Sequence, residues 1–124
     1  MDLENKRTNT KSESYKENEN MLLSAFKKTS IPDEEILENL HLFITPQQIR
    51  RILFFYEIYQ EILPIPGVIM QFGVRWGREL SLLESFRTIF EPFNHSRKII
   101  GFDTFKGYYG THEKDGNNKV IKEG

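Results

Sequence analysis

The chain has 124 residues, and its 17 basic and 18 acidic residues leave a formal net charge of −1. This balance excludes a strongly basic nucleic-acid binder, and the absence of cysteine excludes disulfides, iron–sulfur clusters and thiolate zinc sites. Every apolar run is shorter than the roughly 18 residues that cross a bilayer, and the charged N-terminus lacks the apolar stretch of a secretory signal. We therefore expect a cytoplasmic chain of at most one domain that binds neither nucleic acid nor membrane.

The first half of the chain is predicted to contain a polar tail followed by helices. Residues 1–20 are polar and of mixed charge, so they bury too little apolar surface to offset the entropy of ordering, and we predict a disordered tail. Residues 21–66 are predicted to form an N-terminal helical segment. Helices are expected at 21–28, at about 33–41 and at 46–63.

The third of these helices has the clearest boundaries. Thr45 and Gln48 form a capping-box pair, in which each side chain can bond the other's backbone amide, and Pro46 takes the first helical position. Pro64 ends the helix because proline lacks an amide donor and its ring disfavours helical backbone before it.

Residues 67–110 carry a strand–turn–helix–strand pattern. The apolar runs at 68–72 and 98–102 are continuous rather than alternating, which is typical of strands in a parallel sheet that is covered on both faces. A helix is expected between them at 78–90, and a crossover of this length suits parallel strands. We therefore predict an α/β chain containing the first βαβ unit of a Rossmann-like fold. Residues 111–124 are polar again and are either a tail or the start of a longer remainder.

Candidate ligand-binding residues lie where the two strands end. Gly73 and Gly77 bracket the turn after the first strand, where glycine lets the backbone approach a ligand closely. The amides that begin the following helix add hydrogen-bond donors. Asp103 ends the second strand, and its carboxylate can accept the hydroxyls of a ribose. Because parallel strands end at one edge of a sheet, these groups should share one crevice.

The spacing of the glycines indicates which ligand fits. The turn has the pattern G-x-x-x-G with Arg75 and Trp76 inside it, whereas a dinucleotide fingerprint has the pattern G-x-G-x-x-G. The sequence also lacks the G-x-x-x-x-G-K-[ST] loop that cradles phosphates. A pyrophosphate cofactor is therefore disfavoured, and an adenosyl group without phosphates fits better.

Two motifs together resemble those of the macrocin O-methyltransferase (TylF/MycF-like) family. Residues 71–77 (QFGVRWG) correspond to the family pattern acid-x-G-x-x-x-G, and residues 103–107 (DTFKG) to D-[ST]-F-x-G. The resemblance covers roughly residues 45–110. It implies a class I methyltransferase fold, S-adenosylmethionine as cofactor, and a small-molecule or sugar substrate, with a sugar or glycoconjugate hydroxyl as methyl acceptor.

The resemblance also implies roles for single residues. Gly73 and Gly77 would contact the methionine part of the cofactor, and Asp103 would hold the ribose hydroxyls. Thr104 and Phe105 would lie beside the ribose and the adenine.

Gln71 is included among the cofactor-binding residues although it departs from the family pattern, because the family has an acid at this position. An amide oxygen forms a weaker hydrogen bond to the cofactor's ammonium than a carboxylate does.

The family's catalytic base and magnesium-binding carboxylates correspond to positions after 124, so no catalytic residue can be assigned here. Magnesium is expected only for a longer member of the family. The three histidines are isolated from other ligand types, so no metal site is predicted in this chain. Two parallel strands with unpaired edges are not expected to be stable alone, and the chain therefore looks like the N-terminal part of a longer methyltransferase, with a homo-oligomer left open.

Two other functions are compatible with the same residues. The chain could be a truncated or degenerate Rossmann-like module without catalysis, or another transferase that uses a nucleotide or coenzyme A ligand on the same scaffold, since a fold does not fix a function.

Overall fold

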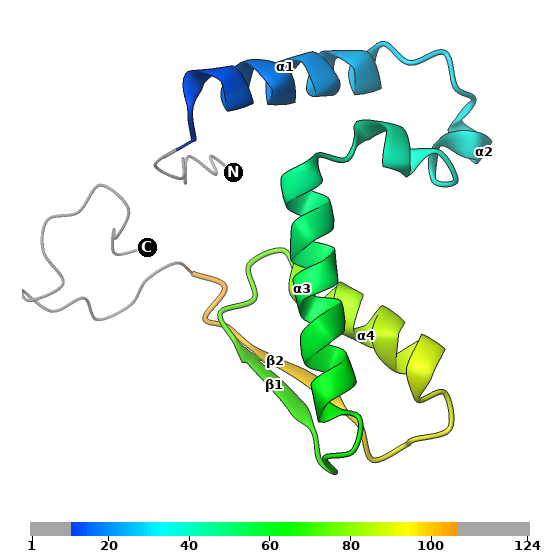
Figure 1. Cartoon of the computed structure of the whole chain (residues 1–124), viewed down its shortest axis with the longest axis vertical. Helices are drawn as coiled ribbons and strands as arrows, with labels where there is room; N and C mark the ends of the chain where they lie inside the picture. The colour runs from blue at the N-terminus through cyan, green and yellow to red at the C-terminus, as the bar shows by residue number, and fades with distance from the viewer. Residues whose placement is uncertain (1–10, 107–124) are drawn as a thin grey trace, which may run out of the picture. The chain divides into compact units, whose positions relative to one another are not determined.

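The computed structural model describes residues 11–106, which divide after Arg51 into two compact units (Figure 1). The first unit holds α1 (Glu13–Lys27), α2 (Asp33–Ile36) and the 3-10 helix η1 (Leu40–Phe43). Helix α3 (Pro46–Ile62) begins in the first unit and ends in the second. The second unit also holds β1 (Ile69–Phe72), α4 (Arg78–Phe90) and β2 (Ile99–Phe102).

Helix α1 starts earlier than the sequence predicted. The predicted disorder of residues 1–20 is wrong for residues 13–20, which are helical, while residues 1–10 lie outside the described part of the chain. The side chain of Ser12 caps the helix by accepting a hydrogen bond from the Tyr15 amide at 3.3 Å. The Tyr15 hydroxyl shares a further hydrogen bond of 3.2 Å with the hydroxyl of buried Thr45. A cap and one tertiary contact thus extend the helix expected at 21–28.

The segment that follows forms two short turns instead of the helix predicted at about 33–41. Helix α2 ends at Ile36, and the side-chain amide of Asn39 donates to the Glu35 carbonyl at 2.9 Å, which satisfies a terminal carbonyl. Leu37 is largely exposed, so no buried apolar stripe supports a longer helix.

The predicted start of α3 is confirmed. The Thr45 amide donates to Oε1 of Gln48 at 2.7 Å, and the Gln48 amide donates to Oγ1 of Thr45 at 3.3 Å. The helix begins at Pro46 and ends at Ile62, one residue before the predicted end.

The two strands pair in parallel, as predicted. Ile69 lies opposite Ile99 and Phe72 lies opposite Phe102. Helix α4 spans Arg78–Phe90 as expected and connects the strands. The chain therefore contains the predicted βαβ unit, with the carboxyl ends of both strands at the same edge.

Helices α3 and α4 both pack against one face of this sheet (Figure 1). The core of the second unit is formed by Tyr59 of α3 with Leu83 and Phe86 of α4. The partly buried side chains packed around them are Phe55, Ile62, Leu63, Ile69, Leu82 and Ile99. Most of α3 therefore belongs to the βαβ unit, whereas the sequence placed the whole helix in a separate segment that ends at residue 66.

The other face of the sheet is exposed in the described part of the chain. Burial alternates along β1, so the predicted continuous burial of this strand is wrong: Ile69 is half-buried, whereas Phe72 is 76% exposed. The rings of Phe72 and Phe102 stack on this outer face with centroids 5.1 Å apart. Alternation follows from the strand geometry, because both helices cover the same face.

Buried Arg97 joins the loops at the amino ends of the two strands. Its side chain is 3% exposed, and its Nε donates to the Glu91 carboxylate at 2.9 Å. The two other guanidinium nitrogens donate to the backbone carbonyls of Gly67 at 2.9 Å, Ile62 at 3.0 Å and Ile65 at 2.6 Å. One side chain thus satisfies the carbonyls where α3 ends and where the chain turns into β1.

Glu91 extends this network to the core. It accepts a hydrogen bond of 2.6 Å from the Tyr59 hydroxyl and one of 2.9 Å from the Asn94 side-chain amide. Burial, together with the bond to the Glu91 carboxylate, raises the pKa of Tyr59 well above its usual value. The Tyr59 hydroxyl is therefore a fixed donor that links α3 to the loop after α4.

We expect Arg97→Met to lower the free energy of unfolding by about 3–5 kcal/mol, because it leaves the Glu91 carboxylate buried without its cation and removes the guanidinium donor from three backbone carbonyls. The measurement is urea denaturation followed by circular dichroism. Arg87→Met is the control, since Arg87 pairs with the more exposed Glu84 and its loss should cost much less stability. Equal losses in both variants would contradict the assignment.

Candidate functional site

The carboxyl ends of β1 and β2 form a corner that holds the residues singled out in the sequence. The Gly73 amide donates to the Phe102 carbonyl at 2.8 Å, so the backbone hydrogen bonds between the two strands continue one residue beyond the end of β1. The turn formed by residues 73–77 therefore starts beside Asp103, the first residue after β2.

The Asp103 carboxylate is bound by backbone amides from both segments. Its Oδ2 accepts hydrogen bonds from the amides of Val74 at 2.7 Å and Arg75 at 2.8 Å, and its Oδ1 accepts one from the Phe105 amide at 2.9 Å. Two consecutive amides that converge on one oxygen form an anion-binding concavity. These hydrogen bonds, led by the one from Arg75, lower the pKa of Asp103 to about 2.

Both glycines of the turn adopt backbone conformations that favour glycine. Gly73 and Gly77 each have φ of 82°, which is the left-handed region. Gly77 precedes α4 and offers no side-chain cap to the helix. No atom lies within 4 Å of the position that a Cβ on Gly73 would take, so the backbone there is open to an approaching group.

Gln71 touches the same turn from β1. Its Nε2 donates to the Gly73 carbonyl at 2.9 Å, and its Oε1 is buried without a hydrogen-bond partner among residues 11–106. A buried acceptor without a donor costs about 1–3 kcal/mol. An ammonium group that reached this atom would supply the missing donor, and this role of Gln71 stays a prediction.

Thr104 and Phe105 continue from Asp103 along the same edge. The Thr104 hydroxyl accepts a hydrogen bond from the Lys106 amide at 3.3 Å. The Phe105 ring is 73% exposed, and this residue has φ of 54°. The six predicted residues thus all lie on the two segments that meet at the corner, while their roles toward a ligand stay predictions.

Sequence reasoning missed Gly101, which controls how the corner packs. A Cβ at this position of β2 would lie 2.7 Å from Cγ2 of Val74 and would also overlap the Leu80 side chain of α4. Glycine therefore lets the turn and the first part of α4 sit directly on the strand. The available signal was a glycine inside a strand, which marks a close approach of neighbouring groups.

The backbone amides of the turn are largely used within the protein. The Gly73 amide donates to the Phe102 carbonyl, and the Gly77 amide donates to the Val74 carbonyl. The amides of Val74 and Arg75 both donate to the Asp103 carboxylate. A phosphate-binding loop presents such amides to the ligand instead. These four amides are therefore not free to cradle a phosphate.

The described residues of this corner do not form a cluster of metal ligands. In the part of the chain that the structure describes, no group of three or more histidine, aspartate or glutamate side chains could hold a metal ion. Magnesium binding therefore has no support in these residues. No helix between residues 11 and 106 combines the length and apolar character needed to cross a membrane.

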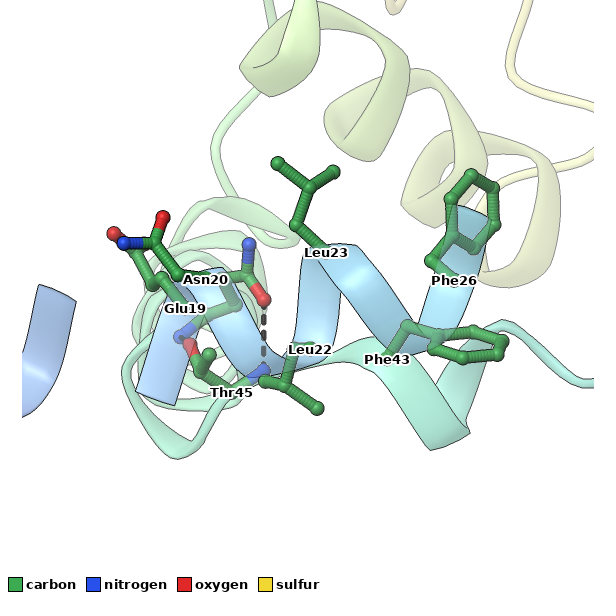
Figure 2. A pocket seen from close by; sticks show the side chains of 8 residues that line it. Glu19, Asn20, Leu22, Leu23, Phe26, Phe43 and Thr45 are labelled. Atoms are coloured by element: carbon green, nitrogen blue, oxygen red, sulfur yellow. Dashed lines mark hydrogen bonds between the residues drawn. The ribbon is translucent and has the colours of Figure 1, made fainter. Parts of the chain in front are cut away.

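The first unit contains a separate hollow of about 420 Å³ (Figure 2). It is lined by Glu19, Asn20, Leu22, Leu23, Phe26, Phe43, Thr45 and Gln48. The rings of Phe26 and Phe43 meet edge to face with centroids 5.1 Å apart. In the wall, the Thr45 amide donates to Oε1 of Gln48, and the dashed line in Figure 2 marks this bond. None of the predicted site residues lines this hollow.

Comparison with solved structures finds similarity to CalS11. A structure described as a calicheamicin methyltransferase is 34% identical with a TM-score of 0.86, and the match covers 93% of this chain and 45% of that one. An apo structure, described as a TDP-rhamnose 3′-O-methyltransferase of calicheamicin biosynthesis, is 39% identical with a TM-score of 0.75. That match covers 78% of this chain and 41% of the other. No protein-family model and no curated protein matches the chain.

The chain thus spans less than half the length of the solved structures that it matches. The described residues adopt a part of the Rossmann-like methyltransferase fold, as the sequence predicted, and the chain resembles an O-methyltransferase.

The depressed pKa of Asp103 makes stability depend on pH in a defined direction. The carboxylate has a pKa of about 2 in the folded protein, against about 4 in an unfolded chain, so it stabilises the fold above about pH 4 and loses this effect as the pH falls toward 2. We expect the difference in free energy of unfolding between the wild type and Asp103→Asn to be constant near neutral pH and to shrink between about pH 4 and 2. Urea denaturation across that range measures it, and a difference independent of pH would contradict the assignment.

Gly101→Ala should destabilise the second unit by about 1–3 kcal/mol, because the added methyl overlaps side chains of the turn and of α4. Ser85→Ala, on the exposed side of α4, is the control and should change stability by less than about 0.5 kcal/mol. Thermal unfolding of both variants gives the comparison. A tolerated alanine at position 101 would show that the close approach is not required.

Proposed function

We propose that the chain carries the cofactor-binding part of an S-adenosylmethionine-dependent O-methyltransferase that acts on a sugar or glycoconjugate hydroxyl. The observation that supports it most is the corner itself, where a carboxylate at the end of β2 is bonded to a glycine-bounded turn at the end of β1. The acceptor class is supported by the similarity to a TDP-rhamnose 3′-O-methyltransferase and by the two motifs that resemble the macrocin O-methyltransferase family.

The cofactor, when bound, supplies an electrophilic methyl group on a sulfonium. In this chain the open backbone at Gly73 would receive its methionine part, and the buried Oε1 of Gln71 would accept a hydrogen bond from its ammonium. The exposed ring of Phe105 and the neighbouring Thr104 would line the ribose and adenine, and Asp103 stands at the position that the sequence assigned to the ribose hydroxyls.

The arrangement of the turn supports this ligand over a nucleotide or coenzyme A. Those ligands carry phosphates, which bind to free amides at the start of a helix or in a glycine-rich loop. Here the amides of Val74 and Arg75 are occupied by the chain's own carboxylate. A second anion at the place of these two amides would meet the negative charge of Asp103, which supports an adenosyl group without phosphates.

Titration calorimetry with S-adenosylhomocysteine tests the proposal. We expect micromolar binding to the 124-residue chain, and a loss of binding in Asp103→Ala because the turn and the loop after β2 then lose their common partner. Asp33→Ala removes an exposed carboxylate from α2 and should leave the affinity unchanged. NAD and coenzyme A should not compete.

Two results would contradict the proposal. A folded sample that gives no heat with S-adenosylhomocysteine would favour a non-catalytic module. Competition by NAD or coenzyme A would favour a transferase that uses a phosphate-bearing ligand.

A further inference from the structure

Two residues of the corner have backbone conformations that are unfavourable for their type. Arg75 and Phe105 both have φ of 54°, and they are the non-glycine residues with positive φ between residues 11 and 106. A side chain in this region brings its Cβ close to backbone atoms, so the conformation persists only where the surroundings hold it.

Both residues are hydrogen-bonded to the same carboxylate. The Arg75 amide donates to Oδ2 of Asp103 at 2.8 Å, and the Phe105 amide donates to Oδ1 at 2.9 Å. One residue lies in the turn after β1 and the other in the loop after β2. The carboxylate therefore connects the two unfavourable conformations across the edge of the sheet.

Packing does not explain either conformation. Both side chains are exposed, and the Arg75 guanidinium lies 6.0 Å from the centroid of the likewise exposed Trp76 ring. Since neither side chain is buried, the interactions that favour these backbones are those made by their amides.

The hydrogen bonds also limit what else the carboxylate can do. A carboxylate offers about four lone-pair sites; the amides of Val74, Arg75 and Phe105 take three of them, and the Thr104 backbone also interacts with this carboxylate. At most one site remains, which is too few to hold both hydroxyls of a ribose in the way that the sequence suggested.

We propose that Asp103 is a positioning residue: it holds Arg75 and Phe105 in left-handed conformations, and its contribution to ligand affinity passes through those two backbones rather than through contact with ribose hydroxyls. The turn and the loop after β2 then have the shape of the bound state before a ligand arrives. This inference rests on the proposed function only in naming the ligand as an adenosyl compound.

A double-mutant cycle in the 124-residue chain tests whether Asp103 acts on ligand affinity through the backbone of Arg75. Asp103→Asn should weaken binding of S-adenosylhomocysteine about tenfold, and Arg75→Gly alone should change it little, since glycine adopts positive φ without strain. In the double variant Arg75→Gly/Asp103→Asn, glycine no longer needs the carboxylate, so a substantial part of the tenfold loss should be regained. A direct contact with the ribose predicts no regain, and that result would overturn the inference.

An analogue of S-adenosylhomocysteine that lacks both ribose hydroxyls gives a second readout. If Asp103 acts through the backbone, Asp103→Asn should weaken binding of the analogue by the same factor as binding of the parent compound. If the carboxylate holds the hydroxyls, the substitution should leave the affinity for the analogue unchanged, which would overturn the inference.

A measurement without ligand separates this inference from the proposed function. In nitrogen-15 correlation spectra, the amide signals of Arg75 and Phe105 should shift in Asp103→Asn, whereas that of Phe86 in the core of α4 should stay in place. If the wild type binds no S-adenosylhomocysteine but these amides shift, the proposed function fails and the positioning role of Asp103 stands. If the two amides do not shift, the positioning role fails, whatever the chain binds.

Discussion

A single buried cation, the guanidinium of Arg97, fixes the arrangement on which the corner depends. Burying a charge is costly unless hydrogen bonds satisfy it, and here the Glu91 carboxylate and three backbone carbonyls do so. Because those carbonyls belong to the end of α3 and the loop before β1, while Arg97 itself precedes β2, the two strands start from one fixed point. Their register then places Phe72 beside Phe102 at the opposite edge.

At that opposite edge the Asp103 carboxylate joins two segments by accepting hydrogen bonds from backbone amides, as the Arg97 guanidinium joins two segments by donating to backbone carbonyls. Asp103 joins the turn after β1 to the loop after β2, and Gly101 provides the space that lets Val74 pack against the strand. The two ends differ in exposure, which matters for function. Arg97 is sealed in the protein, whereas the corner at Asp103 presents the open backbone of Gly73 and an exposed Phe105 ring to solvent.

These features are compatible with the proposed binding of an adenosyl cofactor at the corner. The amides of Gly73, Val74, Arg75 and Gly77 already have partners within the protein. In the proposed function, Oε1 of Gln71, which has no partner among residues 11–106, would offer an acceptor to the ligand's ammonium.

Caps, prolines and apolar runs act within a few residues, so the sequence by itself determined where α3 begins and where α4 and both strands lie. It also determined that Asp103 lies beside a glycine-bounded turn. Tertiary structure decided the rest. The extension of α1 through Tyr15 and Thr45, the packing of α3 onto the same sheet face as α4, and the exposed outer face of β1 all depend on residues far apart in the chain. Two partners of the Asp103 carboxylate do too, because the amides of Val74 and Arg75 lie 29 and 28 positions away. A sequence pattern identifies side chains but not which backbone groups converge on them.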